Sequence, residues 1–132
     1  MNLKQIAKDS AKTLISYFTY QAMRTVLEQL SETDPPQAMW LRRFSFGENS
    51  HIQESEIYLE ELLRERPALA FRIMTVREHI ASEIADFLPE MARTGIQEFN
   101  MQHRRQHLER VTQLEFTSPS AADYPPEGEG DP

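Results

Sequence analysis

Hydrophobic positions recur at helical spacing along most of this chain. From Leu3 to about Glu115 they return every three or four residues, the period of an α-helix with one buried face. Strict alternation of apolar and polar residues, typical of a half-buried strand, is scarce. The pattern predicts an all-α fold with one helical domain over residues 1–115. Residues 116–132 are rich in Pro, Gly, Ser and acidic residues, which predicts a disordered tail.

Prolines and capping residues divide the pattern into four predicted helices. The first runs from Leu3 to Ser31, and the second is a short helix that Asp34 caps and that begins at Pro35 or Pro36. Residues 47–49, which include a glycine, form a predicted loop.

The second half of the chain contains one short and one long predicted helix. Ser50, with Gln53 three residues later, forms a capping box for the third helix. Pro67 opens the fourth helix, which continues to about Leu114. Its ~48 residues would span ~70 Å if they were straight, about twice the ~36 Å diameter of a compact domain of this length. We therefore expect one long helix that bends near Pro89, where a proline lacks the N–H group.

The first predicted helix is apolar on two opposite sides. One side has the pattern of an ordinary core face: Leu3, Ala7, Ala11, Leu14, Phe18, Ala22 and Val26. The opposite side carries another apolar set, flanked by Thr13, Tyr17 and Arg24: Tyr20, Met23, Leu27 and Leu30. Either the helix is sandwiched inside the fold, or its second face binds a partner. On the first alternative, the two tyrosines are half-buried packing residues.

The long fourth helix indicates a dimer. It has one apolar stripe made of Leu69, Ile73, Val76, Ile80, Ile84, Phe87 and Met91. Such a stripe is more often core than interface, but this helix is too long for its own domain to cover. A two-fold homodimer with antiparallel long helices would bury it most simply.

Charge and composition exclude several classes of protein. The formal net charge of −7 argues against a nucleic-acid binder that works by bulk electrostatics, and no apolar run reaches the length of a membrane span. The absence of cysteine excludes disulfides and thiolate chemistry. The basic stretch 101–110 keeps one alternative open, a helical adaptor whose fourth helix binds an acidic partner or nucleic acid.

Residues for catalysis are missing. His103 and His107 have the spacing of a metal pair, but Arg104 and Arg105 lie between them and would repel a cation. No glycine-rich phosphate loop is present, and the carboxylates follow solvated helix faces. The sequence therefore predicts neither an enzyme nor a cofactor or metal site. An all-helical hydrolase, the remaining enzymatic alternative, would need catalytic residues that the sequence does not contain.

Six short segments, which occur in the family's order along residues 1–115, resemble the RbcX family. They are residues 16–22 (SYFTYQA), 34–36 (DPP), 58–60 (YLE), 72–78 (RIMTVRE), 87–91 (FLPEM) and 103–105 (HRR). The resemblance implies a protomer of four helices that pairs into an arc-shaped homodimer. It implies an ATP-independent chaperone that binds the C-terminal peptide of the Rubisco large subunit and promotes assembly of its octameric core. Small subunits then displace it. The expected location is the cyanobacterial cytosol, with carboxysome association as a further option.

The resemblance also implies two sets of binding residues. A central groove for the peptide would be lined by Thr13, Tyr17, Tyr20, Gln29, Ile52 and Gln53. Peripheral contacts with the large subunit would come from Glu32, Arg72 and Arg104.

Overall fold

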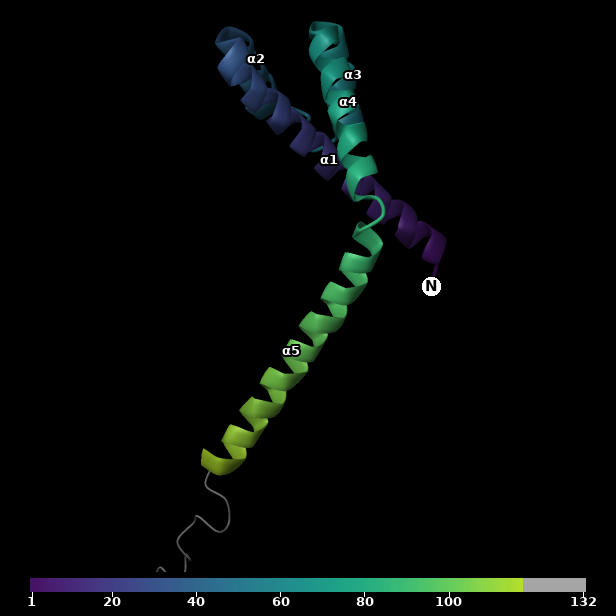
Figure 1. Cartoon of the computed structure of the whole chain (residues 1–132), viewed down its shortest axis with the longest axis vertical. Coiled ribbons are helices and arrows are strands. Elements are labelled where there is room, and N and C mark those ends of the chain that lie inside the picture. The colour runs from purple at the N-terminus through teal and green to yellow at the C-terminus, as the bar shows by residue number, and fades with distance from the viewer. Residues whose placement is uncertain (118–132) are drawn as a thin grey trace, which may run out of the picture. The chain divides into compact units, whose positions relative to one another are not determined.

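The computed structural model of the chain describes residues 1–117, which form five α-helices and contain no strand (Figure 1). The helices are α1 (Leu3–Thr33), α2 (Pro35–Phe46), α3 (Ser55–Glu65), α4 (Pro67–Ile84) and α5 (Leu88–Thr117). This confirms the all-α prediction. The chain divides into a compact unit, Met1–Asp86, and a second unit that begins at Phe87. Most of the predicted tail, residues 118–132, lies outside the described residues.

Side-chain caps fix the first two helices where the sequence predicts them. The side chain of Asn2 accepts a hydrogen bond from the backbone N–H of Gln5, at 3.1 Å. Asp34 acts at two helix ends, because its backbone N–H donates to the Leu30 carbonyl and its carboxylate accepts from the Gln37 N–H. One residue therefore ends α1 and begins α2.

The predicted capping box at Ser50 is wrong. Helix α3 begins at Ser55 and has no side-chain cap. The Oγ of Ser50 instead donates to the carbonyl of Ser45, at 2.6 Å, and accepts from the N–H of Ile52, at 3.2 Å. Serine side chains bond neighbouring backbone groups in turns as readily as at helix ends. Here those bonds fold a loop, residues 47–54, between α2 and α3.

The predicted bend of the long helix is a break between α4 and α5. Residues 85–87 form turns, and Pro89 lies in the first turn of α5. A proline removes the hydrogen bond to the carbonyl four residues earlier and clashes with it. That carbonyl belongs to Ala85, the C-cap residue of α4, which follows the last helical residue, Ile84. The expected fourth helix therefore becomes two, and the described chain has five helices.

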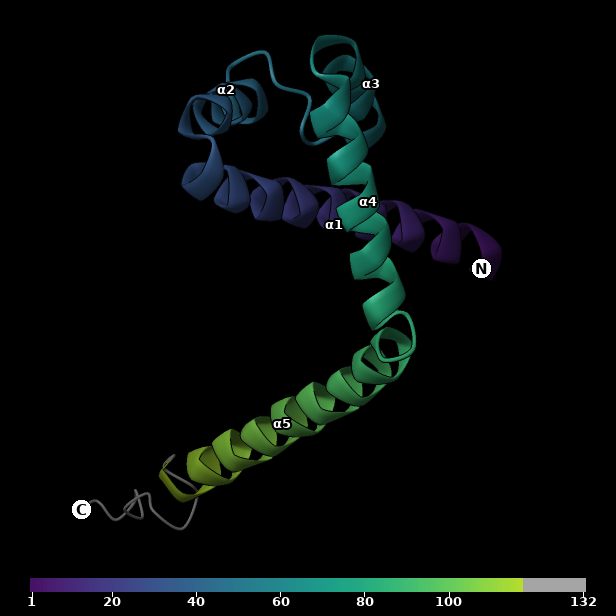
Figure 2. The same ribbon diagram turned by 45° about the horizontal axis from the view of Figure 1, so that its top comes forward.

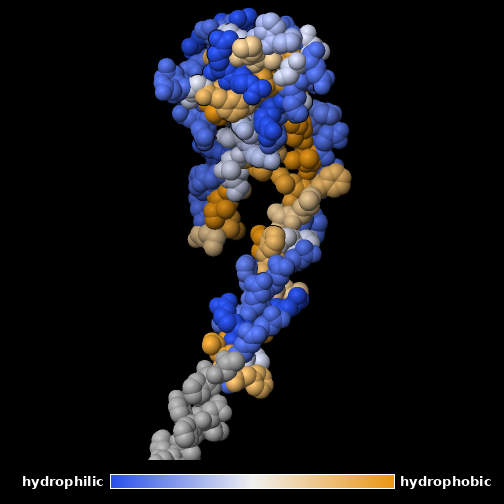
Figure 3. All heavy atoms as spheres, turned by 90° about the vertical axis from the view of Figure 1, so that its left-hand side faces the viewer, coloured by the Kyte–Doolittle hydropathy of each residue, from blue (hydrophilic) through white to orange (hydrophobic). Residues whose placement is uncertain are grey.

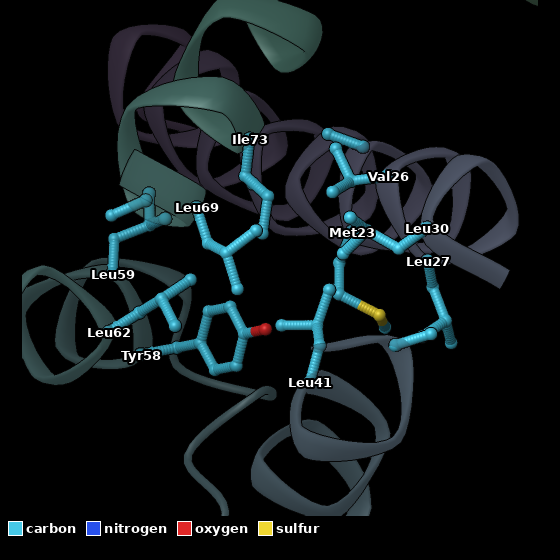
Figure 4. Close-up of a cluster of buried hydrophobic side chains, with 13 residues drawn as sticks. Met23, Val26, Leu27, Leu30, Leu41, Tyr58, Leu59, Leu62, Leu69 and Ile73 are labelled. Atoms are coloured by element: carbon cyan, nitrogen blue, oxygen red, sulfur yellow. The ribbon is translucent and has the colours of Figure 1, made fainter. Parts of the chain in front are cut away.

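The core of the first unit lies where α1 meets α2, α3 and α4. Figure 2 shows α2 and α3 on the same side of α1, with α4 crossing it. The buried side chains pack against one another (Figure 4): Ala22, Met23, Val26, Leu27, Leu30, Ala38, Leu41, Tyr58, Leu59, Leu62, Leu69, Ala70 and Ile73.

The C-terminal half of α1 is buried on both of its apolar sides. Ala22 and Val26 come from the predicted core face, and Met23, Leu27 and Leu30 come from the opposite face. The interpretation of that second face as a partner surface is therefore wrong for these three residues, which belong to the core of their own chain. The sandwiched alternative describes this half of the helix.

The N-terminal half of α1 has little cover from its own chain. Leu3, Ala7 and Ala11, predicted as core, are exposed, and so are Ile6 and Ile15. Figure 3 shows hydrophobic side chains, in orange, open to solvent beside hydrophilic ones in blue. The helical periodicity of these residues is correct, but the first buried residue of α1 is Thr19.

Helix α5 is a long helix without a core of its own. Among its described residues, only Leu88 and Gly95 are even half-buried. Its large apolar side chains are exposed within one chain: Met91, Ile96, Phe99, Met101, Leu108, Val111, Leu114 and Phe116. These exposed apolar side chains are available for contacts with another chain.

Candidate functional site

An open hollow of about 460 Å³ lies beside the middle of α1 in the first unit. It brings together four residues of the predicted groove, namely Tyr17 and Tyr20 of α1 and Ile52 and Gln53 of the loop. Ser16 and Phe46, which the sequence analysis did not single out, complete the lining. The first unit thus assembles most of the expected groove from segments more than thirty residues apart in the sequence.

Aromatic rings form two walls of this hollow. The rings of Tyr20 and Phe46 meet edge to face, with centroids 6.4 Å apart and planes at 86°. Tyr17, one helical turn earlier, is 57% exposed, and Phe46 is 51% exposed. The guanidinium carbon of Arg24 lies 6.0 Å from the centroid of the Tyr20 ring, which places a cation next to an apolar wall.

Hydrogen bonds from the end of α2 hold the loop wall in place. The carbonyl of Ser45 accepts from Ser50 Oγ, whose oxygen in turn accepts from the N–H of Ile52. The Oγ of Ser45 is buried and lies 2.6 Å from the hydroxyl of Tyr58. Burial raises the pKa of Tyr58 to about 12, so this hydroxyl stays protonated. The Ile52 backbone is therefore tied to the core through a chain of hydrogen bonds that ends at Tyr58.

An arginine fixes the start of α3 against α4 and α1. The guanidinium of Arg77 donates two bonds to the carboxylate of Glu56, at 2.8 and 3.2 Å, and one to Thr19 Oγ1, at 3.0 Å. Hydrogen bonding from Arg77 lowers the pKa of Glu56. Thr19 is fully buried and also donates to the Ile15 carbonyl. Three helices therefore meet at one side chain, which sets where α3 begins after the loop.

Two predicted groove residues lie outside the hollow. Thr13 is exposed one turn before Tyr17, and its hydroxyl donates to the Asp9 carbonyl at 3.2 Å. Gln29 lies nine residues after Tyr20, or ~13 Å along the axis. Its Oε1 accepts a hydrogen bond from Nη2 of Arg72 on α4. Both lie on α1, but neither lines the hollow.

The predicted peripheral residues are spread over three helices. Glu32 is exposed in the last turn of α1, and Arg104 is exposed on α5 in the second unit. Arg72 is exposed on α4 and holds the Gln29 amide. A residue expected at the periphery and one expected in the groove are thus direct neighbours.

Phe46 was missed because its role depends on a contact between distant segments. It is the last residue of α2 and stands directly before the predicted loop. The sequence marks it only as an aromatic residue at a helix end. Its position opposite Tyr20 follows from the angle at which α2 returns along α1, which no local pattern specifies.

The chemistry of the hollow suits binding. Rings and an isoleucine supply apolar contact area, and two phenol groups, a serine hydroxyl and an amide supply hydrogen bonds. Within residues 1–117 no group of three or more His, Asp or Glu side chains could hold a metal ion. In the same part of the chain, every helix is too short or too polar to cross a membrane.

Known proteins of the same kind match almost the whole described chain. The family described as RbcX protein matches residues 1–113. Proteins named RuBisCO chaperone RbcX from Nostoc sp. (strain PCC 7120) and Anabaena sp. (strain CA) are 65% and 67% identical over 120 residues. Each alignment covers 91% of this chain, and the two cover 89% and 87% of the respective relatives. A crystal structure of RbcX in complex with substrate is 50% identical, with a TM-score of 0.78, over 85% of this chain and 99% of that one. With the order of its helices and its sequence both matched, the chain belongs to the RbcX family.

Proposed function

We propose that this chain is an ATP-independent assembly chaperone for Rubisco. It binds the C-terminal peptide of the large subunit and promotes formation of the octameric core of large subunits, from which small subunits then displace it. The names of its relatives favour this function over the helical adaptor that binds an acidic partner or nucleic acid. The observation that carries the proposal is the hollow in which Tyr17, Tyr20, Phe46, Ile52 and Gln53 converge.

The hollow suits an extended peptide with an aromatic anchor. A ring from the peptide can pack between Tyr17 and Phe46, which are both more than half exposed. The amide of Gln53 and the tyrosine hydroxyls can hold backbone groups beside it. An open site with few polar contacts gives moderate affinity, and a chaperone that small subunits must displace requires such reversible binding.

The working unit is proposed to be a homodimer. The exposed apolar residues of α5, and those at the start of α1, need a cover that one chain does not supply. In the dimer, residues 1–115 form the chaperone domain and residues 116–132 its tail. The peripheral residues Glu32, Arg72 and Arg104 contact the large subunit outside the peptide. The proposed chaperone is no enzyme and acts in the cyanobacterial cytosol, with carboxysome association as a further proposal.

Co-expression tests the function directly. We expect the soluble octameric core to increase when this chain is produced together with the matching large subunit in a bacterial host without small subunits. Native gel electrophoresis with immunodetection of the large subunit measures the yield. Adding small subunits afterwards should release the chaperone from the core. An unchanged yield of the core, with both proteins soluble, would contradict the proposal.

Charge reversal at Arg72 separates assembly from peptide binding. Arg72 lies on α4, outside the hollow, so Arg72→Glu should change the affinity for the C-terminal peptide by less than about twofold. We expect the yield of octameric core to fall about fivefold, which corresponds to one lost polar contact of ~1 kcal/mol. Arg64→Glu on α3 is the matched control, an exposed arginine of the same unit with the same reversal of charge. Equal effects of both reversals on assembly would remove Arg72 from the binding surface.

A further inference from the structure

His51 stands in the loop that forms one wall of the hollow, immediately before Ile52 and Gln53. Its Nδ1 lies 2.9 Å from Oε1 of Glu61, which is almost two helical turns into α3. Both side chains are partly exposed, at 42% and 33%. This is a direct side-chain link between the loop and a helix, ten residues apart in the sequence.

Backbone contacts hold both ends of the loop, and the His51–Glu61 pair adds a side-chain link from the middle of the loop to α3. At the α2 end, Ser50 bonds the Ser45 carbonyl and the Ile52 N–H. At the α3 end, the Glu54 N–H donates to the His51 carbonyl at 2.8 Å. The side chains of Ile52 and Gln53, which line the hollow, lie between these points. A contact at His51 therefore restricts the part of the loop that faces a bound peptide.

We propose that the His51–Glu61 pair positions the loop wall of the peptide site and makes peptide affinity depend on pH. This inference rests on the proposed function of the hollow. His51 touches no ligand in this scheme and acts through Ile52 and Gln53 as a positioning residue. A preorganised wall lowers the ordering cost of binding, so a firm His51–Glu61 link strengthens affinity. A loosened link weakens it.

The direction of the pH effect follows from the charges around His51. The acidic groups that act on it are Glu61 of α3 and Glu54 of the loop itself, and hydrogen bonding to Glu61 is the larger cause of a raised His51 pKa. The link is therefore strongest while His51 is protonated, when it is a charge-assisted hydrogen bond. Its contribution is fully present below the ordinary pKa of histidine and is lost as the pH rises through the raised value. Peptide affinity should fall over the same interval.

Fluorescence anisotropy with a labelled synthetic peptide tests this inference on the intact protein. The peptide has the C-terminal sequence of the Rubisco large subunit, and affinity is measured at about pH 6 and about pH 8.5, on either side of the histidine range. We expect His51→Gln to bind about threefold more weakly than the original at the lower pH, the scale of a partly exposed ion pair. At the higher pH the affinities of His51→Gln and of the original protein should agree within about 1.5-fold. Glu61→Gln should reproduce this profile, and the double variant should add nothing further.

Two results would overturn the positioning role. One is an affinity of His51→Gln equal to that of the original protein at the lower pH. The other is an equal loss at both pH values, which would indicate a structural defect without titration. Tyr20→Ala serves as the control for the site itself. If Tyr20→Ala binds the peptide with normal affinity, the hollow is not the peptide site. If Tyr20→Ala loses binding while His51→Gln keeps the affinity of the original protein, only the role of the His51–Glu61 pair is rejected.

Discussion

Tyr20→Ala is expected to weaken binding of the Rubisco peptide by about 30-fold, the loss of ~2 kcal/mol that marks a buried aromatic anchor in an interface. Tyr20 is the link between the two walls of the hollow, because its ring meets Phe46 at 6.4 Å and lies next to Arg24. Removing the ring opens the hollow toward α2 and frees the Phe46 side chain. Isothermal titration calorimetry measures the affinity, and analytical ultracentrifugation measures the assembly state of the variant.

The packing of Tyr20 requires companion variants. Tyr20 is half-buried against the core, so its removal also costs stability, whereas Tyr17 is mostly exposed. Tyr17→Ala should therefore weaken peptide binding with little change in melting temperature. Tyr20→Phe keeps the ring and isolates the contribution of the hydroxyl.

Phe71→Ala on α4 is the matched control for these substitutions. It removes an aromatic ring of similar exposure, 59%, that does not line the hollow. Peptide affinity should be the same as in the unaltered protein. A folded Tyr17→Ala, Tyr20→Ala double variant that binds the peptide with unchanged affinity would refute the assignment of the site.

Most of the secondary structure could be predicted because local signals specify it. Asp34 with Pro35, and Pro67, mark helix starts by their own chemistry, and the structure begins α2 and α4 at those prolines. Pro89 likewise marks a break, since its effect on the carbonyl of Ala85 is local. Ser50 misled the prediction because a serine can bond either a helix start or a neighbouring loop, and the choice depends on where α2 ends.

The candidate site was less predictable because it depends on packing between segments. A helical wheel places Leu3 and Ala22 on the same face of α1, yet only Ala22 is buried. The wheel gives direction around a helix, but not how far along it the neighbouring helices extend. The same limit explains why Phe46 was missed. The place of Gln29 in the groove was implied by the family resemblance, and in this structure its amide oxygen accepts a hydrogen bond from Arg72. The convergence of Tyr17, Tyr20, Ile52 and Gln53 rested on family resemblance, and the hollow lends it geometric support.

Leu41→Ala is expected to lower the free energy of unfolding by about 3 kcal/mol, within the range for a fully buried leucine. Leu41 has no exposed surface, and Figure 4 shows it between Met23 of α1 and Tyr58 of α3. Its side chain joins α2 to the rest of the core, so truncation leaves a cavity that the crossing helices cannot close. The corresponding fall in melting temperature is about 10 °C for a domain of this size. Far-UV circular dichroism during heating and in urea measures both quantities.

Met39→Ala provides the control on the same helix. Met39 lies two residues away from Leu41 and is 57% exposed, so its truncation should change stability by less than about 0.5 kcal/mol. A loss of stability in Leu41→Ala no larger than in Met39→Ala would show that α2 does not depend on this core. Because α2 ends in Phe46, we also expect peptide binding by Leu41→Ala to disappear at a lower temperature than in the control. Loss of binding and loss of helical signal should then coincide, since the aromatic wall exists only while α2 is packed on α1.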